Sequence, residues 1–163
     1  ADFLEDLKNQ KYDFTFCSRM DQEPLIDFIP VARQELVVIV PPDHPLSDRT
    51  EIRLCETLDY PQILFSRRSG LRPMIDKLFL ACGKQPDCIF EIDEDQTIAG
   101  FVANGFGIAV VPNMPILANM HLKVIHITEA NWERRFYIAY LKNRYRTPLA
   151  EEFLSYVKSH ALI

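Results

Sequence analysis

The sequence lacks the features that mark membrane-spanning and secreted chains. Its 163 residues contain no run of about 18 consecutive apolar residues, the length that a helix needs to cross a bilayer. The opening residues ADFLED have neither the basic head nor the apolar core of a secretory signal. We therefore expect a chain that neither spans a membrane nor is secreted.

Cysteine is also scarce. Cys17, Cys55, Cys82 and Cys88 are too few and too scattered for a disulfide scaffold, and no two of them form a CxxC pair. We expect reduced, buried thiols, because free cysteine is among the most buried residue types. The four histidines show no metal-ligand spacing with carboxylates or thiols, so the sequence predicts no metal site.

Positive charge is in short supply. The 18 Lys and Arg residues are outnumbered by 23 Asp and Glu residues, which gives a formal net charge of −5. This balance argues against a segment that grips a phosphate backbone on its own, so any DNA binding should lie elsewhere. A composition that is 48% hydrophobic and 25% charged is typical of a globular chain that can bury a core.

Motifs of enzymes are missing as well. No serine stands in a G-x-S-x-G elbow, and no histidine accompanies a serine in a recognisable motif. The acidic run 93–95 fits the start of a helix better than a pair of catalytic carboxylates. The glycines at 105 and 107 precede a strand and lack the rest of a dinucleotide fingerprint. The sequence therefore predicts no catalytic residue and no cofactor.

What the sequence does contain is a strand, a helix and a second strand within residues 90–115, FEIDEDQTIAGFVANGFGIAVVPNMP. The acidic run supplies an N-cap for the helix, and Gly105 suits a left-handed C-cap. The apolar run 107–111 predicts a buried strand with parallel neighbours. Because ligands bind beyond the carboxyl ends of such strands, Pro112 and Asn113 should lie near any pocket.

The segment VANGFGIAVVP at 102–112 resembles the "VaxGxGiaxxP" signature of the effector-binding domain of LysR-type transcriptional regulators. Other segments agree in order and spacing: DFTF at 13–16, ELVV through HPL at 35–46, and SGLR at 69–72. The resemblance covers essentially the whole chain. It implies an α/β fold of the periplasmic-binding-protein type II kind, with two Rossmann-like lobes joined by two crossing strands.

The resemblance also implies how the chain divides into lobes. The first lobe should comprise residues 1–61 and 138–163, and the second should comprise residues 62–137. In the family, two strands and a longer helix precede the helix that opens this chain, so the first lobe should lack its opening strand. The sheet edge left open at 13–17 predicts a dimer or another compensating contact.

Apolar periodicity predicts two further helices. One runs over 70–82, with an inward stripe of Leu71, Ile75, Leu78, Phe79 and Cys82. The other starts after Thr147 as N-cap, with Pro148 at its first position. Its predicted inward stripe consists of Leu149, Phe153, Tyr156, Val157 and His160.

A ligand site is predicted where strand ends should converge on a cleft between the lobes. The predicted effector-binding residues are Phe16, Ser18, Ser66, Arg67, Ser69, Thr97, Pro112 and Asn113. Hydroxyl groups, a guanidinium group and a helix N-terminus together favour a small carboxylate or a similar anion. We expect Arg68 and Arg72, close to this cluster, to be solvated surface charges.

The function that the resemblance implies is that of a cytoplasmic sensor domain that binds a small metabolite to control transcription. The family assembles as homodimers and higher oligomers, and DNA would be contacted only through a winged helix-turn-helix that this chain lacks. The family's peroxide sensors carry cysteines on either side of the helix that begins here near Leu71. Cys82 and Cys88 lie at and after its end, so we expect no redox switch.

Two alternatives remain at this point. A stand-alone solute-binding protein of a transporter shares the two-lobed fold and would need an export signal. An enzyme on this fold, such as a dehydratase or deaminase, would need catalytic residues that are not recognisable here. The upstream sequence would discriminate between the regulator and the transporter protein, because a winged helix-turn-helix supports the first and a signal peptide supports the second.

Overall fold

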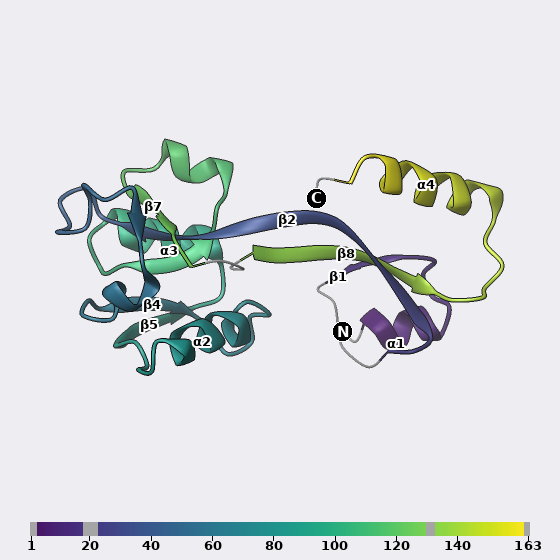
Figure 1. The fold of residues 1–163 in the computed structure, drawn as a ribbon, viewed down its shortest axis with the longest axis horizontal. Helices are drawn as coiled ribbons and strands as arrows, with labels where there is room; N and C mark the ends of the chain where they lie inside the picture. Colours follow the sequence, from purple (N-terminus) through teal and green to yellow (C-terminus); the bar gives the residue numbers. More distant parts are fainter. Residues whose placement is uncertain (1–2, 18–22, 130–132, 162–163) are drawn as a thin grey trace. The chain divides into compact units, whose positions relative to one another are not determined.

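The computed structural model describes residues 3–17, 23–129 and 133–161, and contacts divide the chain into two compact units (Figure 1). Unit 1 comprises Ala1–Gln34 and Glu133–Ile163, and unit 2 comprises Glu35–Trp132. Residues 35–61, which the sequence assigned to the first lobe, thus belong to unit 2. The reason is that one long strand carries the chain into the sheet of unit 2. That the chain works as two lobes, with the bounds given above, stays a prediction.

In unit 1 the chain forms a small sheet with two helices. Strand β1 (Thr15–Cys17) pairs antiparallel with β8 (Glu133–Leu141), and β8 neighbours β2 (Ile26–Val40). Helix α1 (Phe3–Lys8) precedes this sheet in the chain, and α4 (Pro148–Ser159) follows it. Strand β1 stands at the end of the strand order, where the sequence predicted an open edge. The dimer expected from that edge stays a prediction.

Helix α4 begins where predicted but buries a different face. Thr147 caps the helix, because its hydroxyl accepts a hydrogen bond from the backbone N–H of Ala150 at 3.3 Å. Ala150 and Leu154 are buried and Val157 is half-buried, and the last two pack with Ile138 of β8. The predicted stripe is therefore wrong for four residues, which are exposed instead: Leu149, Phe153, Tyr156 and His160.

Strand β2 is the central strand of the sheet in unit 2. Its second half pairs antiparallel with β6 (Ala109–Pro112) and with β7 (Lys123–Ile127). Strand β3 (Glu51–Ile52) joins β7 in parallel. The buried run from Leu36 to Val40 supplies the middle of this sheet, as expected for a strand that is covered on both faces.

Strands β4 (Gln62–Phe65) and β5 (Cys88–Ile92) form a parallel pair beside this sheet. A parallel bridge between Gln62 and Ile108 links β4 to the residue before β6. Parallel neighbours were predicted for the strand at 107–111. The prediction is correct on the side that faces β4 and wrong on the other side, where β6 pairs antiparallel with β2. The register with β2 depends on side chains far apart in the sequence, which periodicity does not reveal.

The helical segments of unit 2 are η1 (Leu54–Thr57), α2 (Arg72–Ala81), α3 (Asp95–Ala103) and η2 (Pro115–Asn119). Helix α2 is buried through Leu71, Ile75 and Phe79, as its stripe predicted. Helix α3 is buried through Ile98 and Val102. Gly105 follows it with a φ of 80°, which confirms the predicted left-handed position. No helix in the described ranges is long and apolar enough to cross a membrane.

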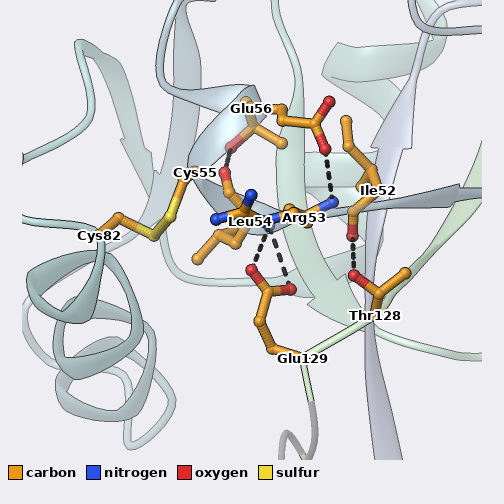
Figure 2. The surroundings of a disulfide bond; sticks show 9 residues. Ile52, Arg53, Leu54, Cys55, Glu56, Cys82, Thr128 and Glu129 are labelled. Carbon is orange, nitrogen blue, oxygen red and sulfur yellow. Dashed lines mark hydrogen bonds between the residues drawn. A yellow bond between two sulfur atoms is a disulfide. The ribbon is translucent and has the colours of Figure 1, made fainter.

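Two of the cysteines are bonded, so the expectation of four reduced thiols is wrong for this pair. Cys55 in η1 and Cys82 at the end of α2 form a disulfide, with their Cα atoms 5.3 Å apart (Figure 2). No local pattern in the sequence predicts this bond, because packing of α2 on η1 brings together two residues 27 positions apart. Cys17 and Cys88 are free; Cys17 is half-buried, but Cys88 is exposed, so the expected burial is wrong for Cys88.

Candidate functional site

The sheet topology of unit 2 brings the ends of several strands to one edge. Strand β4 is parallel to β5 and to the approach of β6, so all three deliver their carboxyl ends to the same side. Because β2 runs antiparallel to β6 and β7, its entry into unit 2 lies at that side too. At that side Ser66, Asp93 and Asn113 follow β4, β5 and β6, while Glu35 lies in β2 and His126 lies near the end of β7. We call this the carboxyl edge.

Ser66 and Asp93 are joined across the carboxyl edge. The Ser66 hydroxyl donates a hydrogen bond to Asp93 Oδ1, and the Ser66 backbone N–H donates to the carbonyl of Ile92 at 2.9 Å. The Ser66 oxygen also accepts from the backbone N–H of Arg68 at 3.3 Å. Asp93 was read from the sequence only as part of a helix cap. The N-cap of α3 is instead Glu94, whose side chain makes no capping bond.

Ser69 lies in the turn that leads into α2. Its hydroxyl oxygen accepts from the backbone N–H of Leu71 at 3.2 Å, and its backbone N–H donates to the carbonyl of Ser66 at 3.0 Å. The turn places two serine side chains within four residues of each other, directly after β4. Both are half-buried, as expected of groups that stay within reach of a ligand.

Of the arginines near this turn, Arg68 is exposed as predicted, whereas the prediction for Arg72 is wrong. Arg67 is exposed over 85% of its side chain, and its Nε lies 4.0 Å from a Glu91 oxygen, so an anion contact is not preformed. Arg72, expected at the surface, is buried. It donates to the Phe65 carbonyl at 2.6 Å, to Glu91 at 2.8 Å and to Asp76 at 2.8 Å.

Arg72 therefore acts as a structural cation. Burial alone would lower the pKa of Arg72, but the hydrogen bonds to Glu91 and Asp76 outweigh burial and raise it. The guanidinium group stays charged and holds the start of α2 against the end of β4 and the middle of β5. A group that already serves two carboxylates and a carbonyl has little capacity left for an anionic ligand.

A second cluster on the carboxyl edge joins the predicted residue Asn113 to Glu35 and His126, which the sequence analysis did not predict. Asn113, a predicted site residue, donates from its side chain to Glu35 Oε2 at 3.0 Å and from its backbone to the Glu35 carbonyl at 2.8 Å. His126 Nδ1 is hydrogen-bonded to Glu35 Oε1 at 2.7 Å. Burial raises the pKa of Glu35, but the bonds from His126 and Asn113 outweigh it and lower the pKa below its ordinary value of 4.5.

The remaining predicted residues are placed as follows. Thr97 lies exposed in the first turn of α3, which starts just after the end of β5. Pro112 is buried and pairs with Leu36 at the end of β6. Phe16 is exposed on β1, in unit 1. Ser18 lies outside the described residues.

A surface depression of about 520 Å³ lies elsewhere in unit 2. Its lining includes Pro41 after the end of β2, Asn104 and Gly105 after the end of α3, and His121. The end of β2 is opposite to the carboxyl edge, and none of the predicted site residues lines this depression. In the part of the chain that the structure describes, no group of three or more His, Cys, Asp or Glu side chains could hold a metal ion.

Unit 2 is thus an α/β body with polar turns gathered where its strands end, which is the arrangement of a ligand-binding domain. The chain belongs to the LysR substrate binding domain family, which it matches over residues 1–162. Its fold is of the periplasmic-binding-protein type II kind predicted from the sequence. Curated relatives are transcriptional regulators, so the transporter alternative is not favoured.

The chain is similar to a curated regulator and to two solved regulator domains. The chain is 37% identical over 157 residues to the uncharacterized HTH-type transcriptional regulator YybE of Bacillus subtilis, covering 96% of this chain and 54% of that regulator. It is 40% identical to the effector binding domain of QuiR in complex with shikimate, with a TM-score of 0.86 and coverage of 98% and 76%. The regulatory domain of Synechocystis CcmR in complex with 2-PG, at 24% identity, 98% and 78% coverage and a TM-score of 0.82, shares the fold. This chain spans about half the length of the curated relatives it matches.

Proposed function

We propose that this chain binds a small hydroxylated organic acid and serves as the sensor of a LysR-type regulator. The observation that carries the proposal is the hydrogen bond from Ser66 to Asp93, close to Ser69, on the carboxyl edge. The Asp93 carboxylate can accept hydrogen bonds from ligand hydroxyls, and the two serine hydroxyls can accept or donate others. The chain's likeness to the domain of QuiR, which was solved with the hydroxylated acid shikimate, supports the same ligand class.

The acidic end of the ligand is assigned to the start of α2. The dipole of α2 favours negative charge there, and Arg67 and Arg68 follow Ser66 on the same turn. Among the described residues Arg67 has one ion pair, the long contact with Glu91, so its guanidinium group is available to a carboxylate that arrives from solvent. The place of the ligand between two lobes stays a prediction.

The role of the whole regulator forms part of the proposal. The ligand would shift an existing equilibrium between arrangements of the regulator, and so change transcription without any turnover of the ligand. DNA would be read by a helix-turn-helix module outside this chain, in a homodimer or higher oligomer located in the cytoplasm. The net charge of −5 agrees with a chain that leaves phosphate binding to another module.

Titration calorimetry on the 163-residue chain tests the ligand class. We expect shikimate to bind and cyclohexanecarboxylate, which has the acid group without the hydroxyls, to bind much more weakly. Asp93→Asn removes a charged acceptor, so it should weaken shikimate binding roughly ten- to a hundredfold, from a contribution of about 1.5–3 kcal/mol. Ser66→Ala should weaken binding by a smaller factor.

The matched control is Glu94→Gln, because Glu94 is the adjacent exposed carboxylate and makes no capping bond. It should leave the affinity unchanged. Equal binding of shikimate and cyclohexanecarboxylate, or undiminished binding by both Asp93→Asn and Ser66→Ala, would remove the hydroxylated ligand from the proposal. Absence of binding by shikimate and by other hydroxylated acids would count against the ligand class altogether.

A further inference from the structure

The disulfide connects η1 to the C-terminal end of α2 in unit 2. Cys55 belongs to η1, and Cys82 is the residue at which α2 ends (Figure 2). Both side chains are half-buried and pack at the margin of the core of unit 2. The sulfur atoms are thus close to the surface, where a small thiol or disulfide can reach them.

The segment around Cys55 is firmly anchored. The backbone N–H of Leu54 donates to both carboxylate oxygens of Glu129, at 3.0 and 3.3 Å, and the Thr128 hydroxyl donates to the carbonyl of Ile52 at 3.4 Å (Figure 2). The Thr57 hydroxyl donates to the Leu54 carbonyl at 2.7 Å. These bonds tie η1 to the segment that follows β7. Cys55 therefore sits on a fixed base.

Helix α2 is anchored at its other end. Arg72, at the first turn, bonds to the Phe65 carbonyl and to Glu91, which fixes the start of the helix to β4 and β5. Ile75 and Phe79 hold its middle in the core. The C-terminal end, by contrast, carries the exposed Leu80 and reaches the anchored η1 through Cys82. The disulfide is the covalent hold on this end of the helix.

We propose that Cys55 and Cys82 form a reversible thiol–disulfide couple whose oxidation fixes the end of α2 to η1. The oxidant is a low-molecular-weight disulfide such as oxidised glutathione. One protein thiolate attacks it, releases one glutathione thiol and forms a mixed disulfide. The second protein thiolate then attacks the protein sulfur and releases the second glutathione. Two protein thiols thus lose two electrons and two protons, and one glutathione disulfide becomes two thiols.

Reversibility requires that the reduced form keep the fold. Leu54 and Phe79, on the two elements that the disulfide joins, are fully buried in the core of unit 2, and we expect this packing to hold both elements in place after reduction. Because α2 runs from the turn of Ser66 and Ser69 to Cys82, the couple places a redox input at the far end of the helix that starts at the ligand site. That consequence rests on the proposed function, whereas the couple itself does not.

The two free cysteines are poor competitors for the same oxidant. Burial raises the pKa of the Cys17 thiol. Burial and the charge of Glu91 raise the pKa of Cys88, whose Sγ lies 3.5 Å from the Phe90 carbonyl. Both groups are therefore held in the less nucleophilic thiol form. The bond that forms first should be the one between Cys55 and Cys82.

The test uses the ligand-free 163-residue chain, equilibrated in buffers of increasing ratio of oxidised to reduced glutathione. Mass spectrometry of the trapped thiols should show loss of about two hydrogens, with peptide mapping to Cys55 and Cys82, and dithiothreitol should restore them. Oxidation should raise Tm by roughly 10 °C, as expected for closing a loop of this length. Amide exchange at the end of α2 should slow by about tenfold.

The matched variants are Cys55→Ser with Cys82→Ser, which remove the couple, and Cys17→Ser with Cys88→Ser, which remove the other thiols. Only the first pair should lose the Tm shift. The natural chain gives the peptide map even if a variant folds poorly. A Cys55 and Cys82 pair that stays reduced at every ratio, or that dithiothreitol opens only after denaturation, overturns the proposal. If the peptide map shows the bond between Cys55 and Cys82 but shikimate does not bind in the calorimetry above, the proposed function fails and the redox couple stands.

Discussion

The two units bury their apolar side chains in different ways. In unit 2 one continuous cluster joins the strands to both α2 and α3. In unit 1 the described buried residues fall into two groups, and the adjacent residues Ile138 and Ala139 of β8 belong to different ones. Because neighbours on a strand face opposite sides of a sheet, each group is a thin layer on one face. Unit 2 should therefore resist unfolding more strongly, and unit 1 should open first.

The strongest test of this contrast is a cavity in the core of unit 2. Phe79 is fully buried on α2, so Phe79→Ala should lower the free energy of unfolding by about 3–5 kcal/mol. Urea unfolding followed by circular dichroism measures the loss. Leu80→Ala is the control, because Leu80 is the next residue of the helix and 67% exposed, and it should cost no more than about 0.5 kcal/mol. Similar values for the two variants would mean that α2 does not pack on the core.

The matching test in unit 1 concerns the face of α4. Leu154 is buried in one of the thin layers, so Leu154→Ala should cost about 2–3 kcal/mol, the lower part of the range for such changes. Amide exchange of β8 should speed up as well. Leu149→Ala, at a residue that is 77% exposed, should change stability by less than about 0.5 kcal/mol. A larger cost at Leu149 than at Leu154 would restore the face that the sequence predicted.

The sequence predicted unit 2 well because its signals are local. The stripe of α2 and the strand after Gly105 are each visible in a short window, and the structure confirms them. For α4 the apolar residue types pointed to a face that includes Phe153 and Tyr156. The structure buries Ala150 and Leu154 instead, because packing on β8 selects the face by fit.

The candidate site shows the same limit. Ser66, Ser69 and Asn113 were predicted because each was expected beyond the end of a strand, and the structure places them after β4 and β6; their role in binding stays a prediction. Glu35 and His126 were missed, since they meet only through the antiparallel pairing of β2 with β7. Arg72 was assigned to the surface because nothing in its neighbourhood of the sequence shows the distant carboxylate of Glu91 that pairs with it.

The smallest expected effect concerns the link between Glu35 and His126. The two bonds to Glu35 lower its pKa below 4.5 in spite of burial, so its contribution to stability is complete above about pH 4.5 and is lost as the pH falls through the folded value. The Glu35 side chain is 43% exposed, which limits the contribution to about 1 kcal/mol or less. Urea midpoints of the natural chain and of Glu35→Gln should therefore differ near neutral pH and converge as the pH falls below the folded pKa of Glu35. Glu94→Gln, which removes an exposed carboxylate elsewhere on the carboxyl edge, should show no such convergence. A difference that grows as the pH falls would mean that Glu35 is stabilised in its protonated form, and the cluster with His126 and Asn113 would then have to be redrawn.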